Sequence, residues 1–218
     1  MDFIQNIIAA ILPPLLIVYF IFINDIHEKE PRKLILKTLF LGCLVVLPVS
    51  IFSLEREYYS DNFSFALLGV ALFEEGFKFL FLRLFIYQKT DFNEPYDGIL
   101  YAVVISMGFA LIENLFYVLG NEGRELSVAL LRMFTAIPMH ATCGVIMGYF
   151  VGKTKLDNGN KTLLLFIGLL ISILIHGLYD YFIFEGLGVI FSLLILFVAI
   201  RLSNIAIKLH QENSNFKN

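Results

Sequence analysis

The sequence contains no tryptophan, only two cysteines and few charged residues. Cys43 and Cys143 both lie within apolar runs, where a buried free thiol is expected and a disulfide framework is not. Charged residues make up 16% of the chain and sum to a net charge of −3, which argues against the broad basic surface used for nucleic-acid binding. The amino terminus lacks the basic region and cleavage site of a signal peptide, so the first apolar run is expected to stay in the mature protein.

What the chain does have is apolar sequence. Hydrophobic residues make up 58% of the 218 positions, and the mean hydropathy is +0.79. A helix that crosses a bilayer needs about 20 mostly apolar residues. Seven runs meet this length: Phe3–Ile23, Leu34–Leu54, Phe63–Tyr87, Gly98–Leu119, Leu126–Phe150, Thr162–Phe184 and Leu187–Ile207. They predict an all-α, polytopic transmembrane bundle of about seven helices. We expect one domain over residues 1–218, because no linker or internal repeat is evident.

Prolines and basic loops predict further features of this bundle. Pro13-Pro14 and Pro138 should kink the first and fifth helices. Lysine and arginine in short loops favour the cytoplasm. Nine such residues share one side, against Arg56 and Arg124 on the other: Lys29, Arg32, Lys33, Lys89, Lys153, Lys155, Lys161, Lys208 and Lys217. The amino terminus is therefore expected outside and the carboxyl terminus in the cytoplasm.

Several ionisable residues interrupt the apolar runs. They are Glu74, Glu75 and Lys78 in the third run, Glu113 in the fourth, His140 in the fifth, and His176 and Asp180 in the sixth. A charged side chain at mid-membrane costs about 2.5 to 3.5 kcal/mol on insertion scales, so these residues must face inward or pair. Residues four apart share a helix face, which groups Glu74 with Lys78, Phe109 with Glu113, and His176 with Asp180. By depth, the predicted polar cavity opens toward the outside.

Three different functions are compatible with buried carboxylates and histidines. Water activated by a carboxylate would make the chain a hydrolase. A proton relay would make it a proton-coupled transporter, although the repeated halves that many transporters carry are not evident. A third reading is a non-catalytic membrane chaperone or immunity protein, and the same charges could also be structural ion pairs between helices.

The order and spacing of these residues resemble the PrsW family of membrane proteases, which is similar to the CAAX-processing membrane endopeptidases. Three motifs carry the resemblance, and they lie in a core of about residues 63–184: Glu74-Glu75-x-x-Lys78, Phe109-x-x-x-Glu113 and His176-x-x-x-Asp180. The second motif ends in glutamate where the CAAX group usually has histidine, which favours the PrsW branch.

The resemblance implies a multi-pass protease of the bacterial cell membrane. Its substrate would be a single-span (RsiW-like) anti-sigma factor, cut first at its extracytoplasmic part close to the membrane. This site-1 cleavage would start the regulated proteolysis that releases a sigma factor for an envelope-stress response.

The favoured mechanism needs no cofactor. Glu75 or Glu74 takes a proton from water, and His176, oriented by Asp180, stabilises the oxyanion or passes the proton on. Supporting residues would hold the water or polarise the carbonyl: Glu113, Asn114 and His140, with Lys78 and Phe109 beside them. In the alternative, zinc supplies the activated water. Its candidate ligands are Glu75, Glu113, His140 and His176.

Overall fold

The structure, a computed structural model, describes residues 2–53, 55–121, 123–156, 159–186 and 189–214. These residues form helices and connecting turns, with no strand among them. The elements in chain order are α1 (Asp2–Ile23), α2 (Arg32–Phe52), η1 (Arg56–Tyr58), α3 (Asn62–Ser64), η2 (Phe65–Ala71), α4 (Leu72–Phe81), η3 (Leu82–Ile86), α5 (Pro95–Leu119), α6 (Glu125–Phe134), α7 (Ala136–Leu156), α8 (Lys161–Phe184) and α9 (Val189–Glu212). The predicted all-α, polytopic bundle is confirmed. The predicted helix limits at Leu54 and Leu187 lie outside the described residues.

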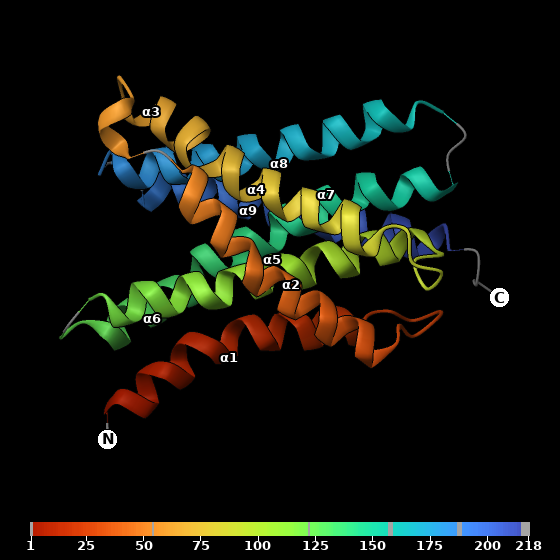
Figure 1. Cartoon of the computed structure of the whole chain (residues 1–218), viewed down its shortest axis with the longest axis horizontal. Coiled ribbons are helices and arrows are strands. Elements are labelled where there is room, and N and C mark those ends of the chain that lie inside the picture. Colours follow the sequence, from red (N-terminus) through yellow and green to blue (C-terminus); the bar gives the residue numbers. More distant parts are fainter. Residues whose placement is uncertain (1, 54, 122, 157–158, 187–188, 215–218) are drawn as a thin grey trace.

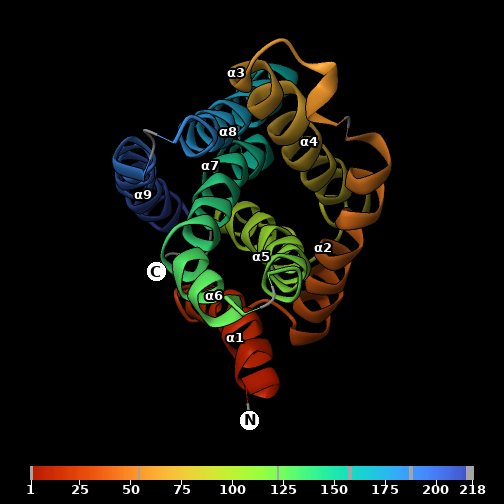
Figure 2. The same cartoon turned by 90° about the vertical axis from the view of Figure 1, so that its left-hand side faces the viewer.

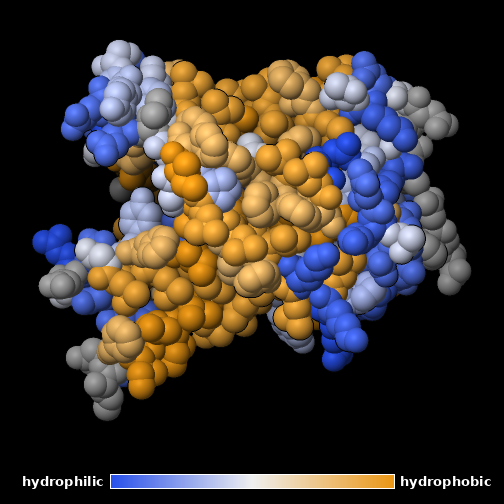
Figure 3. All heavy atoms as spheres, viewed as in Figure 1, coloured by the Kyte–Doolittle hydropathy of each residue, from blue (hydrophilic) through white to orange (hydrophobic). Residues whose placement is uncertain are grey.

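Six helices of the described chain are long and apolar enough to cross a membrane. Together with the stretch from α3 to η3, they account for the seven predicted runs. The apolar side chains form a broad belt between two more polar ends (Figure 3). α1 begins at one end and α9 finishes at the other, and the Lys-bearing loop between α1 and α2 lies at the end where α9 finishes (Figure 1).

Helix α5 lies at the centre of the bundle, enclosed by the other helices (Figure 2). Its first three-fifths are almost wholly buried, from Pro95 to Ala110. Glycines allow α7 to approach it closely, since a Cβ atom on Gly148 would lie 2.3 Å from the carbonyl oxygen of Gly98. This close packing fixes α5, which carries the second motif, against α7, which carries His140.

Two predicted helices differ from plain α-helix. The third is continuous from residue 62 to residue 86 but contains the π-helical segments η2 and η3 on either side of α4. The fifth is divided at Thr135, where φ is −126° and ψ is −81°, into α6 and α7. The break lies three residues before Pro138, whose ring would clash with the carbonyl of Phe134 in an uninterrupted helix. Pro13 and Pro14 both lie inside α1, which is a single helix from Asp2 to Ile23, and the kink expected there stays a prediction.

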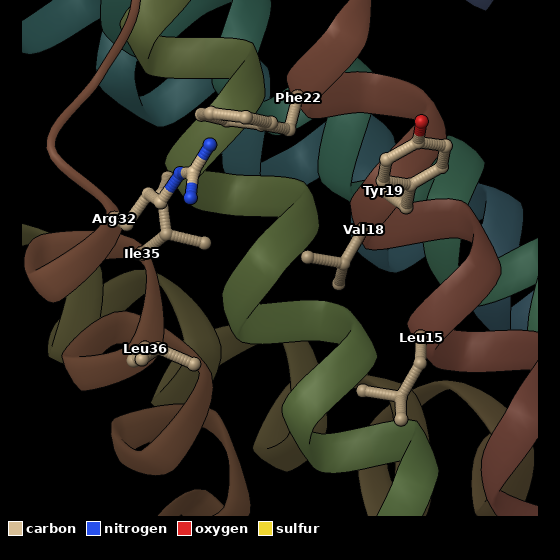
Figure 4. A pocket seen from close by; sticks show the side chains of 7 residues that line it. All are labelled: Leu15, Val18, Tyr19, Phe22, Arg32, Ile35 and Leu36. Atoms are coloured by element: carbon tan, nitrogen blue, oxygen red, sulfur yellow. The ribbon is translucent and has the colours of Figure 1, made fainter.

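An apolar groove lies between α1 and α2, over α5 (Figure 4). Its volume is about 470 Å³, and Arg32 is the only charged one among the described residues that line it: Leu15, Val18, Tyr19, Phe22, Arg32, Ile35 and Leu36. The groove lacks the acid–base groups that chemistry requires, so the functional site has to be sought elsewhere.

Candidate active site

Eight of the predicted site residues meet inside the bundle, although four different helices carry them. α4 supplies one side of the cluster, α5 a second, α7 a third and α8 a fourth. The residues, in that order, are Glu74, Glu75 and Lys78; Phe109 and Glu113; His140; His176 and Asp180. Charged side chains on apolar helices are costly when they face lipid, so their burial inside the bundle is expected.

Lys78 lies at the centre of the cluster. Its Nζ atom is 2.8 Å from Glu75 Oε1, 3.4 Å from Glu74 Oε2 and 3.0 Å from His140 Nδ1. The ammonium also lies over the ring of Phe109, 4.2 Å from the ring centroid. The predicted contact between Glu74 and Lys78 is therefore present. Both adjacent glutamates reach the same lysine, so α4 places two carboxylates in one site.

His176 joins the first and third motifs. Its Nδ1 atom is 2.9 Å from Glu75 Oε1, and its Nε2 atom is 3.3 Å from Asp180 Oδ2 and 3.8 Å from Glu74 Oε2. The pairing of His176 with Asp180 matches the contact that their spacing predicted. With a carboxylate on each side, the imidazole ring is held in one orientation.

His140 joins the second motif to Lys78. Its Nε2 atom is 2.9 Å from Glu113 Oε2. Because a lysine ammonium can only donate, His140 Nδ1 accepts from Lys78, and Nε2–H donates to Glu113. The His140 ring is thus held as one tautomer, and its edge-to-face packing on Phe109, with centroids 5.5 Å apart, fixes its plane.

Arg132 of α6 completes this arrangement and was missed by the motif analysis. Its Nη2 atom is 2.6 Å from Glu113 Oε2, its Nε atom is 2.8 Å from Asn114 Oδ1, and its guanidinium lies over the Tyr117 ring. The only sequence signal was an arginine inside an apolar run. Asn114 also donates to the carbonyl of Ala10 at 2.8 Å, so its amide links α1 to α6 and does not contact the central cluster.

A cavity of about 500 Å³ leads to the cluster. Glu74, Glu113, His140, His176 and Asp180 line its inner part. Asn121 and Phe184 also line it, which directs the cavity toward the end of the bundle where α5 and α8 finish. That end lies opposite the Lys-bearing loop between α1 and α2 (Figure 1). Glu75 does not line the cavity and is fully buried behind Glu74.

The cluster also has the donor set of a metal site. One ligand atom from each of Glu74, Glu75, His140 and His176 lies within 4.8 Å of all the others. Two imidazoles with carboxylates suit zinc, and Glu75 Oε2 is a buried oxygen without a hydrogen-bond partner. The bond from His140 to Glu113 resembles the carboxylate contact that orients metal-binding histidines. The residues therefore fit a divalent metal, with Glu74 taking the place that the sequence had suggested for Glu113.

Comparison with known proteins finds one family. The profile of a family described as "PrsW family intramembrane metalloprotease" matches residues 30–203. A "Protease PrsW" of Oceanobacillus iheyensis is 38% identical over 82% of each chain. Proteins of the same name from Bacillus subtilis and Clostridioides difficile are 31% and 34% identical, over 79% and 88% of this chain and 80% and 85% of theirs. No solved structure matches.

Proposed function

The chain belongs to the PrsW family of intramembrane metalloproteases, and we propose that it makes the first cut in a single-span anti-sigma factor. As a multi-pass membrane protease of bacteria it hydrolyses peptide bonds. In the proposed setting, this site-1 cleavage starts the proteolysis that releases a sigma factor during envelope stress. The observation that carries the proposed chemistry is a cavity inside the bundle that is lined by three carboxylates, those of Glu74, Glu113 and Asp180, and by the imidazoles of His140 and His176.

We assign water activation to Glu74. Its carboxylate lines the cavity, and its contacts to Lys78 and His176 are long, at 3.4 Å and 3.8 Å. Glu75 is fully buried, and its Oε1 atom is shared by Lys78 and His176 at 2.8 Å and 2.9 Å. A general base has to reach the water whose proton it takes. Glu74 meets that requirement, while Glu75 holds Lys78 and His176 in position.

The proposed reaction is a hydrolysis in two proton transfers. Glu74 takes a proton from water while the water oxygen bonds to the peptide carbonyl carbon. His176, held by Asp180, stabilises the negative charge on the carbonyl oxygen. The carbon–nitrogen bond then breaks, and the proton held by Glu74 passes to the leaving amine. His140 also lines the cavity, and its two ring nitrogens are bonded to Lys78 and to Glu113, which Arg132 holds, so we assign it the positioning of Lys78 beside the two glutamates.

A divalent metal held by Glu74, Glu75, His140 and His176 would supply Lewis-acid polarisation of the carbonyl and a more acidic bound water. Glu113 and Asp180 contact the Nε2 atoms of His140 and His176, and these contacts would keep the two imidazoles oriented toward such a metal. Lys78 lies among the four ligand residues, so its ammonium would have to turn away to admit the metal.

The proposed orientation brings the cavity to the substrate. The basic loops favour an amino terminus outside the cell. In that orientation the end of the bundle where α5 and α8 finish faces the extracytoplasmic side. A single-span protein beside the bundle would present the residues just outside its own membrane helix to this opening. The expected cut is therefore extracytoplasmic and close to the membrane.

The substrate proposal can be tested with purified chain in liposomes. A single-span anti-sigma factor tagged at both ends is co-reconstituted with it, and the fragments are mapped by mass spectrometry. We expect one extracytoplasmic cut near the membrane, absent with the Glu74→Gln variant. If other single-span proteins are cut and the anti-sigma factor is not, the protease assignment stands and the substrate proposal is wrong.

A further inference from the structure

The groove between α1 and α2 exists because these two helices pack on the same partner and not on each other. Both lie against α5, and they make few or no contacts between themselves. Leu15, Val18 and Phe22 of α1 face Ile35 and Leu36 of α2 across a volume of about 470 Å³ (Figure 4). Whatever lies in the groove therefore touches both helices.

The groove lies within one leaflet of the membrane. Leu15 and Phe22 are seven residues apart on α1, which is about 10 Å along a helix axis. Half of the hydrocarbon core of a bilayer is about 15 Å thick. α1 ends at Ile23 and α2 begins at Arg32. One end of the groove is therefore at the membrane surface, and the other is near mid-membrane.

The walls of the groove are open to lipid. Leu15, Tyr19 and Leu36 are 36%, 62% and 66% exposed. An apolar wall alone gives a lipid tail little preference for this place, because lipid tails are as apolar as leucine side chains. A lipid that stays in the groove therefore needs a polar anchor at the surface end.

Arg32 lies at that surface end. Its guanidinium group is beside Phe22 of the opposite wall (Figure 4). The side chain is exposed, and among the described residues no carboxylate oxygen lies within 4.0 Å of it. The first turn of α2 also contains Lys33 and no acidic residue. The helix dipole opposes basic residues in a first turn and favours an anion there.

The charged residues of the neighbouring loop do not neutralise Arg32. Asp25 and Glu30 are 1% and 3% exposed, and neither lines the groove. Glu28 lines a different cavity. Lys29 donates to three backbone carbonyls at the end of α1. Arg32 is therefore the cation that a ligand in the groove meets.

The depth of the groove distinguishes a lipid from a transmembrane helix. A single-span helix crosses about 30 Å of hydrocarbon and would need a groove along both leaflets. The residues that line this groove reach only as far as Leu15 and Leu36. A phospholipid has the matching shape, because its tail fills one leaflet and its phosphate lies at the surface.

We propose that the groove binds one anionic phospholipid, with a tail between α1 and α2 and its phosphate on Arg32. A guanidinium group suits phosphate oxygens because it can donate two parallel hydrogen bonds. The lipid joins two helices that otherwise contact α5 separately. In the proposed orientation it belongs to the cytoplasmic leaflet. The lipid site does not depend on the substrate or the mechanism proposed above.

Native mass spectrometry of the full-length chain in detergent tests the anchor. Phosphatidylglycerol and phosphatidylcholine with the same tails are titrated in turn. We expect one phosphatidylglycerol per chain, bound about fivefold more tightly than phosphatidylcholine. Arg32→Gln should weaken phosphatidylglycerol binding at least about tenfold, because it removes hydrogen bonds to a charged group. Lys33→Gln, which removes the same charge from a position that does not line the groove, should weaken it about fivefold or less.

A pair of tryptophan variants tests the seat of the tail. Leu36 lines the groove, whereas Leu47 lies on the same helix outside it, and the two are 66% and 61% exposed. We expect Leu36→Trp to lose most of the bound phosphatidylglycerol, because the indole fills the space between the helices, and Leu47→Trp to keep it. Full retention by Leu36→Trp would show an anion on Arg32 without the groove and overturn the proposal.

The same spectra detect the other possible occupants. Equal binding of the two lipids, or equal losses in Arg32→Gln and Lys33→Gln, would show that no specific anionic lipid is held. A dimer free of lipid would show that a second copy covers the groove. Displacement of the lipid by an added single-span helix, lost in Leu36→Trp, would show a helix site. Each of these results would overturn the proposal.

Discussion

Replacement of Lys78 by methionine tests whether the buried cluster is held together by this one ammonium. Lys78 is 1% exposed and contacts Glu75 at 2.8 Å and Glu74 at 3.4 Å. Lys78→Met keeps the chain length and removes the charge, which leaves two buried carboxylates facing each other. Breaking a buried ion pair by removing one partner costs about 3 to 5 kcal/mol. For a chain of this size that corresponds to a Tm lowered by about 6 to 20 °C.

Thermal unfolding in detergent can be followed with a thiol-reactive dye in a Cys43→Ser background, because the chain has no tryptophan and Cys143 is fully buried, whereas Cys43 is only half-buried. The matched control is Lys208→Met. Lys208 forms the same i,i+4 pair with Glu212, but it is 77% exposed, and such pairs are worth about 0.3 to 0.5 kcal/mol. Adding Glu75→Gln to Lys78→Met should recover at least about 1 kcal/mol, since it removes one of the stranded charges. A Lys78→Met variant as stable as Lys208→Met, or strict additivity in the double variant, would refute the reasoning.

Three further predictions concern other parts of the chain. Arg132→Gln should lower the kcat for peptide cleavage more than it raises the KM, because the arginine acts through Glu113 on the orientation of His140; equal activity in steady-state assays would contradict it. Gly148→Val should destabilise the bundle by about 3 kcal/mol or more, because the added side chain would overlap α5. Gly76→Ala should be neutral or stabilising in the same unfolding assay, because its Cβ atom would meet nothing within 4 Å. Hydrogen bonds from Ser64 and Ser60 lower the pKa of Asp61. The stability that Asp61 contributes is therefore complete above about pH 4 and is lost as the pH falls through its folded-state pKa. A Tm difference between the wild type and Asp61→Ala that grows on acidification would be inconsistent with this.

The sequence predicted the helices and the motif residues for physical reasons. Lipid excludes charge, so Glu74, Glu113 and His176 had to face the interior, and i,i+4 spacing paired His176 with Asp180 within a single helix. Both arguments use only local distances along the chain and the polarity of the solvent. The structure agrees with them closely.

Contacts between helices were not predictable in the same way. Arg132 and Glu113 are 19 positions apart on different helices, and their pairing depends on how α6 packs against α5. Residue type alone had suggested Glu113 as a metal candidate, whereas Arg132 and His140 contact its Oε2 atom and Glu74 lies with the other ligands. The burial of Glu30 in a polar loop had no sequence signal, because loop residues are expected to face water.

The most direct test of the central claim compares Glu74→Gln with Gly76→Ala in liposomes containing a tagged single-span protein that the wild type cleaves. Gly76 lies on the same helix and its Cβ position is open, so its variant controls for changes to α4. Removing a general base lowers rates by about 10² to 10⁴. We predict a loss of that size for Glu74→Gln, with the Tm and expression of the wild type, and full activity for Gly76→Ala. Cleavage by Glu74→Gln within tenfold of the wild-type rate would contradict the proposed site.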